Sequence, residues 1–190
     1  MLRTRLAAVF IPLFVAGAAF ADKPVTGGAD TSEQAAKLSG TFSVLQTVGQ
    51  AGVKISEMAD KRAKSDLVKG YARTVSTANA NMDTRIQQLA QKHGIEVAPL
   101  SAQTEEGKSV LDRLKAETTM LESLEGDAFD KEYMTLVTNT QQSVLHVLES
   151  NKGQAKDPEV KQFFSDLTTG VQNRLKTAQD IMAKIYGDQI

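Results

Sequence analysis

The sequence predicts an all-α protein: an antiparallel four-helix bundle with one shorter accessory helix. Good helix formers such as Ala, Gln, Lys, Glu and Leu are abundant. Apolar residues recur at spacings of three and four over long stretches, and no stretch shows the sustained alternation typical of a strand. The length of 190 residues suits one domain.

Residues 1–21 have the features of a secretory signal peptide. Arg3 and Arg5 supply the positive charge, residues 6–18 form the apolar stretch, and small residues precede the end of the segment. This apolar stretch is shorter than the roughly 20 residues that span a bilayer, so cleavage after Ala21 is expected rather than a membrane anchor. We therefore expect an exported protein in a bacterial periplasm. Peripheral association with the outer membrane is compatible with this expectation.

Residues 22–30 contain one proline and a glycine pair and are expected to form a flexible leader before a helical domain over 31–190. The first helix is expected to run to about Ala63. Gly49 and Gly52 lie on or near its apolar face and each weaken a helix by about 1 kcal/mol. Close contact with another helix would explain both glycines.

The second helix is expected to begin after a Ser65 cap and to end at His93, where Gly94 supplies the left-handed cap conformation. Its inward stripe is predicted to be Leu67, Tyr71, Val75, Ala78, Met82, Ile86 and Leu89. After a loop containing Pro99, a shorter helix is expected to end at Gly126. Its inward residues are predicted to be Val110, Leu111, Leu114, Leu121 and Leu124.

A fourth helix is expected to open at Asp127 or Phe129. Its stripe is Phe129, Tyr133, Leu136, Val137, Thr140, Val144 and Leu148. Asp157-Pro158-Glu159 is a strong start for the last helix, because it places an oxygen cap, a proline and an acid in the order that a helix N-terminus favours. The last helix has the most regular apolar pattern in the chain.

Composition and motifs exclude several functions. A net charge of −1 argues against a nucleic-acid partner, and the absence of cysteine excludes disulfides and thiolate metal sites. No segment after the signal peptide is apolar enough for a transmembrane helix. Neither histidine stands three residues after a glutamate, as di-iron bundles require. The sequence predicts no catalytic residue, no cofactor and no complete metal site, and hence a protein that is not an enzyme.

Three polar residues lie on or near the inward stripes of the helices: Asn79, Gln141 and Arg174. One interpretation is that Arg174 packs its stem at the bundle edge and keeps its charged head in water. The other is a polar cluster in the middle of the bundle, formed by all three residues. A buried charge in such a cluster must be paired or well hydrogen-bonded.

The two histidines allow further hypotheses. His93 is interpreted as a cation at a helix C-terminus, where the helix dipole favours it. His146 and Glu149 share a helix face, which makes them either an ordinary surface contact or part of a metal site.

The run Leu124-Glu125-Gly126-Asp127-Ala128-Phe129-Asp130-Lys131-Glu132-Tyr133 resembles the Leu-x-Gly-x-x-Phe-Asp-x-x-Tyr signature of the bacterial family catalogued as domain of unknown function 4142. The resemblance extends in order over nearly all of the chain after residue 21. It implies an exported envelope protein with a ferritin-like helical bundle.

The chain departs from that family at the polar positions. Family members commonly carry histidines where this chain has Asn79, Gln141 and Arg174, and an acid where it has Gly52. The resemblance therefore implies that a metal or proton-transfer site in this fold would lack its ligands here. Arg174 beside the two amides would fill the vacated polar space.

Two functions follow from these observations. The favoured one is a non-enzymatic periplasmic bundle that acts through an envelope protein partner, self-association or envelope maintenance. The alternative is a ferritin-like protein that binds a metal or a small ligand. An amphipathic helix that opens onto a membrane surface ranks below both, because the net charge disfavours anionic lipid.

Overall fold

The computed structural model describes residues 29–187, which form five α-helices and no strand. The signal peptide and most of the leader expected from the sequence, up to residue 28, lie outside the described residues. The all-α prediction is confirmed. The helices are α1 (Ala29–Arg62), α2 (Asp66–His93), α3 (Glu105–Glu122), α4 (Gly126–Asn151) and α5 (Pro158–Tyr186).

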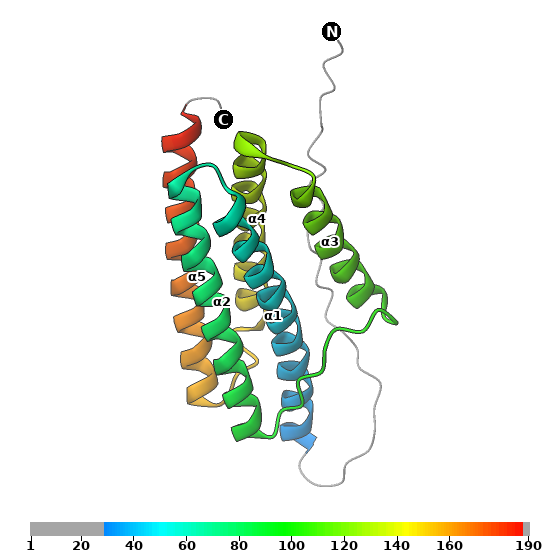
Figure 1. The fold of residues 1–190 in the computed structure, drawn as a ribbon. Coiled ribbons are helices and arrows are strands. Elements are labelled where there is room, and N and C mark those ends of the chain that lie inside the picture. Colours follow the sequence, from blue (N-terminus) through cyan, green and yellow to red (C-terminus); the bar gives the residue numbers. More distant parts are fainter. Residues whose placement is uncertain (1–28, 188–190) are drawn as a thin grey trace.

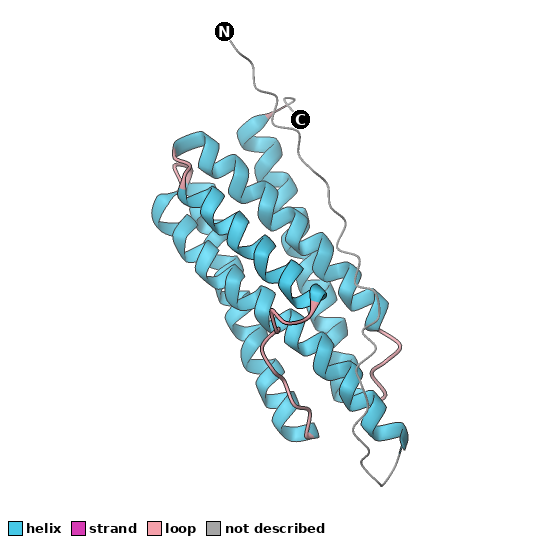
Figure 2. Ribbon diagram, turned by 90° about the vertical axis from the view of Figure 1, so that its right-hand side faces the viewer, coloured by secondary structure: helices cyan, strands magenta, loops and turns pink. Residues whose placement is uncertain are grey.

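Four long helices form the bundle, and α3 stands beside it (Figure 1). The α1–α2 hairpin and the α4–α5 hairpin are the two most extensively packed pairs. Contacts between α1 and α4 and between α2 and α5 close the four into one bundle. The shorter α3 packs on α1 and α4 only lightly, and in the view of Figure 2 it lies on the near side of the bundle. This is the predicted bundle with an accessory helix.

Two predicted helix ends are formed as the sequence indicated. Asp157 caps α5 by accepting the backbone N–H groups of Glu159 at 2.8 Å and of Val160 at 3.1 Å. Gly94 ends α2 with φ 62°, and the N–H of Ile95 bonds back to a carbonyl of that helix. These local signals set the length of both helices.

The link between α3 and α4 differs from the prediction. The shorter helix ends at Glu122 rather than at Gly126, because the Ser123 hydroxyl and N–H both turn back to the carbonyl of Met120. Gly126 is instead the first residue of α4 and has φ 58°, a conformation that favours glycine where the chain turns into the helix.

Leu67 also differs from its predicted place. It is 48% exposed, whereas the adjacent Val68 is fully buried and takes the inward position at the start of α2. By helical spacing, the stripe through Tyr71 and Val75 can continue to Val68 as well as to Leu67. Packing in the core cluster selects Val68.

Within residues 29–187, none of the helices combines the length and the apolar content that crossing a bilayer requires.

Candidate functional site

The apolar core of the bundle is divided into two clusters, one toward each end of the long helices. One includes Phe42, Ile86 and Phe163, and the other includes Val68, Phe129 and Ile181. Between them, at mid-length, glycines and polar residues stand among the apolar side chains of the helices. The candidate site lies at this level.

A cavity of about 50 Å³ occupies the middle of the bundle. Every helix of the described chain contributes to its wall, including α3, which supplies Leu114 and Glu117. The wall is mostly apolar, with a few polar groups among the aliphatic side chains. Its polar side chains are Asn79, Glu117, Thr140, Gln141 and Arg174.

A hydrogen-bonded chain joins three helices beside this cavity. The hydroxyl of Tyr71 in α2 donates to the backbone carbonyl of Arg174 in α5 at 3.0 Å. The side-chain amide of Gln141 in α4 donates through Nε2 to the same hydroxyl oxygen. Burial raises the pKa of Tyr71, although the Gln141 hydrogen bond and the Arg174 charge act in the opposite direction. The phenol therefore stays protonated and holds Gln141 in one orientation.

Three side chains in the wall have a buried atom without a hydrogen-bond partner among the described residues. These atoms are Oε2 of Glu117, Oε1 of Gln141 and Nε of Arg174. Each such atom costs about 1–3 kcal/mol when it stays unsatisfied. All three atoms are enclosed by the surrounding side chains and have almost no accessible surface of their own.

The two charged residues of the wall are both penalised by burial. Burial lowers the pKa of Arg174. Burial raises the pKa of Glu117, and the charge of Arg113 opposes this shift. Arg113 Nε lies 3.4 Å from Glu117 Oε1, so this carboxylate has a cation beside it on its own helix. For Arg174, no ion pair is formed within the described part of the chain.

Two glycines of α1 allow α2 to approach the cavity. A Cβ atom at Gly52 would lie 2.4 Å from Nδ2 of Asn79, and one at Gly49 would lie 2.4 Å from the terminal methyl of Met82. The absence of these Cβ atoms lets both side chains of α2 reach the α1 backbone. The two glycines thus have the close contact that their place in a helix suggests.

The structure places all three predicted site residues, Asn79, Gln141 and Arg174, in the wall of one cavity. Gly52, which the resemblance places where family members carry an acid, lies in the same wall. Arg174 is half-buried with Nε enclosed, and its Nη1 lies near Gly170 of the same helix.

Sequence reasoning missed two members of the site. Tyr71 is predicted on the inward stripe, but no polar partner is predicted for it. The one indication in the sequence is that a buried phenol usually has a hydrogen-bond partner. Glu117, which lies outside the predicted inward stripe of its helix, is half-buried against the cavity. Its signal was its spacing of three from Leu114 on the inward side of that helix.

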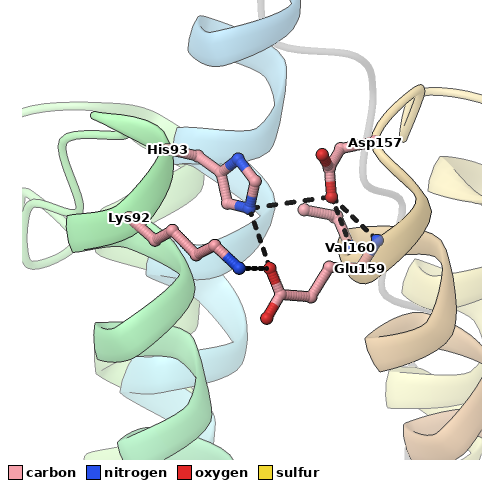
Figure 3. Close-up of polar contacts among 5 residues, drawn as sticks. All are labelled: Lys92, His93, Asp157, Glu159 and Val160. Atoms are coloured by element: carbon pink, nitrogen blue, oxygen red, sulfur yellow. Dashed lines mark hydrogen bonds and ion pairs between the residues drawn. The ribbon is translucent and has the colours of Figure 1, made fainter.

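A second polar cluster lies at one end of the bundle (Figure 3). His93 Nε2, at the end of α2, is 3.6 Å from Asp157 Oδ1 and 3.4 Å from Glu159 Oε2. Lys92 Nζ contacts the same Glu159 oxygen at 2.6 Å. The three candidate ligand atoms lie within 4.8 Å of one another, but Asp157 already caps α5 and Lys92 already neutralises Glu159. We therefore interpret this cluster as an electrostatic clasp that joins α2 to α5.

His146 and Glu149 lie exposed on α4. Glu149 Oε1 lies 3.9 Å from Lys152 Nζ. Neither His146 nor Glu149 belongs to the one group of potential metal ligands found among the described residues. The structure therefore brings no third ligand to this pair within residues 29–187.

The Phe-Asp-x-x-Tyr element has a structural role. Phe129, Asp130 and Tyr133 are all buried in α4. The Asp130 carboxylate accepts the backbone N–H groups of Lys64 and Ser65, and the Tyr133 hydroxyl lies 3.0 Å from Ser56 Oγ. Through these contacts the element binds α4 to α1 and to the turn between α1 and α2.

Comparison with known proteins supports the same architecture. The crystal structure of a putative secreted protein, DUF305, from Streptomyces coelicolor aligns with a TM-score of 0.63 at 14% identity. The alignment covers 76% of this chain and 91% of that one, and at this identity it shows a shared fold alone. No curated protein sequence matches the chain.

A family model matches residues 23–181, which is most of the chain. Its description is that of the family that the Phe-Asp-x-x-Tyr element resembles. The chain therefore belongs to the family described as Domain of unknown function (DUF4142).

Proposed function

We propose that this chain is an exported, non-enzymatic binding protein that holds a small ligand in the cavity at the middle of its helical bundle. The observation that carries the proposal is the interruption of the apolar core at one level by Asn79, Gln141 and Arg174 around a cavity. A bundle of this length could be filled with aliphatic side chains throughout, and buried polar groups without partners reduce its stability. A ligand that fills the cavity would bind the folded state alone and would offset that cost.

Export rests on the features of residues 1–21, with cleavage after Ala21 and release into a periplasm. The absence of enzymatic activity rests on the chemistry of the wall. Within the part of the cavity wall that the structure describes, Glu117 is the one carboxylate, and neither histidine takes part. The other titrating group beside the cavity, the phenol of Tyr71, has its pKa raised by burial and its hydrogen bonded to the carbonyl of Arg174, which disfavours a role as a base.

Action through an envelope protein partner or self-association, which the sequence favoured, has less support in the geometry. Leu67 is the one large apolar side chain that is exposed in the described part of the chain. Stable protein interfaces usually centre on a cluster of apolar or aromatic anchors. The cavity is therefore the better-supported binding feature.

The test is native mass spectrometry with elemental analysis on untagged protein from the periplasm, compared with Val144→Phe, which fills the cavity. We expect a small organic molecule on the wild type that the variant lacks, and no stoichiometric metal. Identical small-molecule profiles for the two proteins would contradict the proposal. A stoichiometric metal would favour the ferritin-like alternative, and added metal should then raise the melting temperature.

A further inference from the structure

The polar groups around the cavity have little left to offer a ligand. The NH₂ group of Gln141 donates to the phenol oxygen of Tyr71, and the phenol hydrogen goes to the carbonyl of Arg174. Oε1 of Gln141, Oε2 of Glu117 and Nε of Arg174 have almost no accessible surface of their own. A molecule in the cavity therefore finds these groups either bonded or enclosed.

The surface that such a molecule meets is mostly hydrocarbon. Each of the five helices contributes an aliphatic side chain to the wall, and these include Val48, Val75, Leu114, Val144 and Val171. A buried water molecule is well held only where it finds about two to four polar partners, whereas an apolar cavity of sufficient size binds apolar molecules. Displacement of poorly held water by an apolar group favours binding further.

The volume limits the size of the apolar group. The cavity measures about 50 Å³. A cavity that takes up benzene measures about 150 Å³, so an aromatic ring is too large for this one. One water occupies about 10–15 Å³ by the same measure, so the space suits roughly three to five non-hydrogen atoms.

The apolar surface continues beyond the main cavity. A smaller cavity of about 10 Å³ shares Val48, Thr140 and Val144 with it. The wall of the smaller cavity goes on to Val44 and Val147, about one helical turn further along α1 and α4. An alkyl group in the main cavity could therefore belong to a free small molecule or to the end of a longer chain.

We propose that the cavity binds an alkyl group of about three or four carbons, which it holds by apolar contact and without hydrogen bonds to the wall. This inference rests on the proposed function, because it names the chemical class of the ligand in the same site. The polar residues of the wall then stabilise one another and shape the cavity, and the aliphatic residues bind the ligand.

Three probes of four non-hydrogen atoms test the chemical class: n-butane has no polar atom, 1-propanol has one and acetamide has two. The measurement is an NMR titration of the mature protein, followed at the methyl groups of Val48, Val75 and Val144. We expect saturable shifts with n-butane, with a dissociation constant between roughly tens of micromolar and one millimolar. The other two should bind at least about tenfold more weakly, because the wall leaves their polar groups without partners.

A fourth probe, 1-octanol, distinguishes the two sources of the alkyl group. If it shifts the same methyl groups and binds more tightly than n-butane, the group is the end of a longer chain that follows α1 and α4. If it binds more weakly, the group belongs to a free small molecule. Both results support the inference, because the cavity takes up an alkyl group in each case.

A variant tests whether the probe occupies this cavity. Val171→Leu adds one carbon to the wall and should weaken n-butane binding by about fourfold or more, the factor that corresponds to one buried methylene. The matched control Val160→Leu makes the same change at a buried valine of α5 outside both cavity walls and should leave binding unchanged. The probe comparison on the wild type requires no variant, so loss of folding in a variant does not remove the test.

Three results would overturn the inference. They are the absence of a saturable shift with n-butane up to its solubility, binding of 1-propanol or acetamide as tight as that of n-butane, and equal effects of the two valine substitutions. None of them decides the proposed function, which is tested separately by the mass spectrometry of the wild type and Val144→Phe.

Discussion

The Asp130 carboxylate accepts the backbone N–H of Ser65 at 2.7 Å across 65 residues of sequence. It also accepts the N–H of Lys64 at 2.9 Å, and its side chain is almost completely buried. One carboxylate in α4 thus satisfies two backbone donors at the turn into α2, where a helix N-terminus leaves such donors free. The α1–α2 turn depends on a residue from the other hairpin.

Replacement of Asp130 tests this anchor. Asp130→Asn keeps one carbonyl oxygen and loses the second acceptor and the charge, so the free energy of unfolding should fall by about 1–3 kcal/mol. Urea denaturation measures the change. Asp127→Asn, which removes only an exposed ion pair with Lys64, is the control and should cost less than about 1 kcal/mol. Equal effects of the two substitutions would show that Asp130 does not anchor the turn.

The buried hydroxyl pair between Ser56 and Tyr133 predicts a non-additive double mutant. Ser56→Ala and Tyr133→Phe each leave one buried hydroxyl without its partner and should each cost about 1–2 kcal/mol. The double variant removes both hydroxyls, so its cost should be smaller than the sum of the single costs by about 1 kcal/mol. Denaturation of all four proteins completes the cycle, and additive costs would mean that the pair contributes no coupling.

Replacement of two glycines by alanine is expected to change the stability of the protein differently. At Gly70 a Cβ atom would meet only Arg73 Nη2 at 3.8 Å, so Gly70→Ala should stabilise the protein by about 0.5–1 kcal/mol through helix propensity. At Gly52 the new Cβ atom would displace the Asn79 amide, so Gly52→Ala should lose that gain. Thermal unfolding compares the two, and a matching gain at Gly52 would show that the close contact with Asn79 carries no cost.

The clasp between α2 and α5 predicts an acid-sensitive contribution to stability. The hydrogen bond from the Val160 N–H, with that of Glu159 and the charge of His93, holds the pKa of Asp157 below its usual 3.8. The hydrogen bond from Lys92 holds the pKa of Glu159 below its usual 4.5. Because both pKa values are lower in the folded state, this stability is fully present above the usual values and is lost as the pH falls through the folded ones.

Asp157→Asn should therefore be less stable than the wild type at pH 7, and the difference should shrink as the pH falls below about 4. Glu159→Gln should behave in the same direction. Urea denaturation at a series of pH values measures the difference. A difference of the same size from neutral to acid pH would mean that the clasp acts through packing and not through charge.

The helix order and the helix ends that rest on local chemistry could be predicted from the sequence. Asp157 and Gly94 act within one turn of their own positions, so their effect is visible in a few consecutive residues. The α3–α4 link was misplaced because Ser123, which ends α3, is not a strong stop signal by itself. Val68 was missed because two neighbouring apolar residues fit the same stripe, and tertiary packing decides between them.

The site could be predicted only in part. Asn79, Gln141 and Arg174 are conspicuous because polar residues rarely stand on or beside apolar stripes, and the structure places them in one cavity wall. The role of Asp130 could not be derived, because its partners are backbone amides that carry no side-chain signal. The contribution of α3 to the wall was equally hidden, since periodicity gives the face of a helix but not the neighbour that it meets.

The light packing of α3 has a consequence for the rate at which a ligand leaves the cavity. α3 supplies Leu114 and Glu117 to the cavity wall and packs lightly, mainly on α1 and α4. A helix with so few tertiary partners opens locally at a lower free energy than the whole molecule. Residence time in the cavity would then follow the opening rate of α3, and a change at its Thr104 cap, remote from the ligand, would alter dissociation while leaving the contacts of the bound state in place.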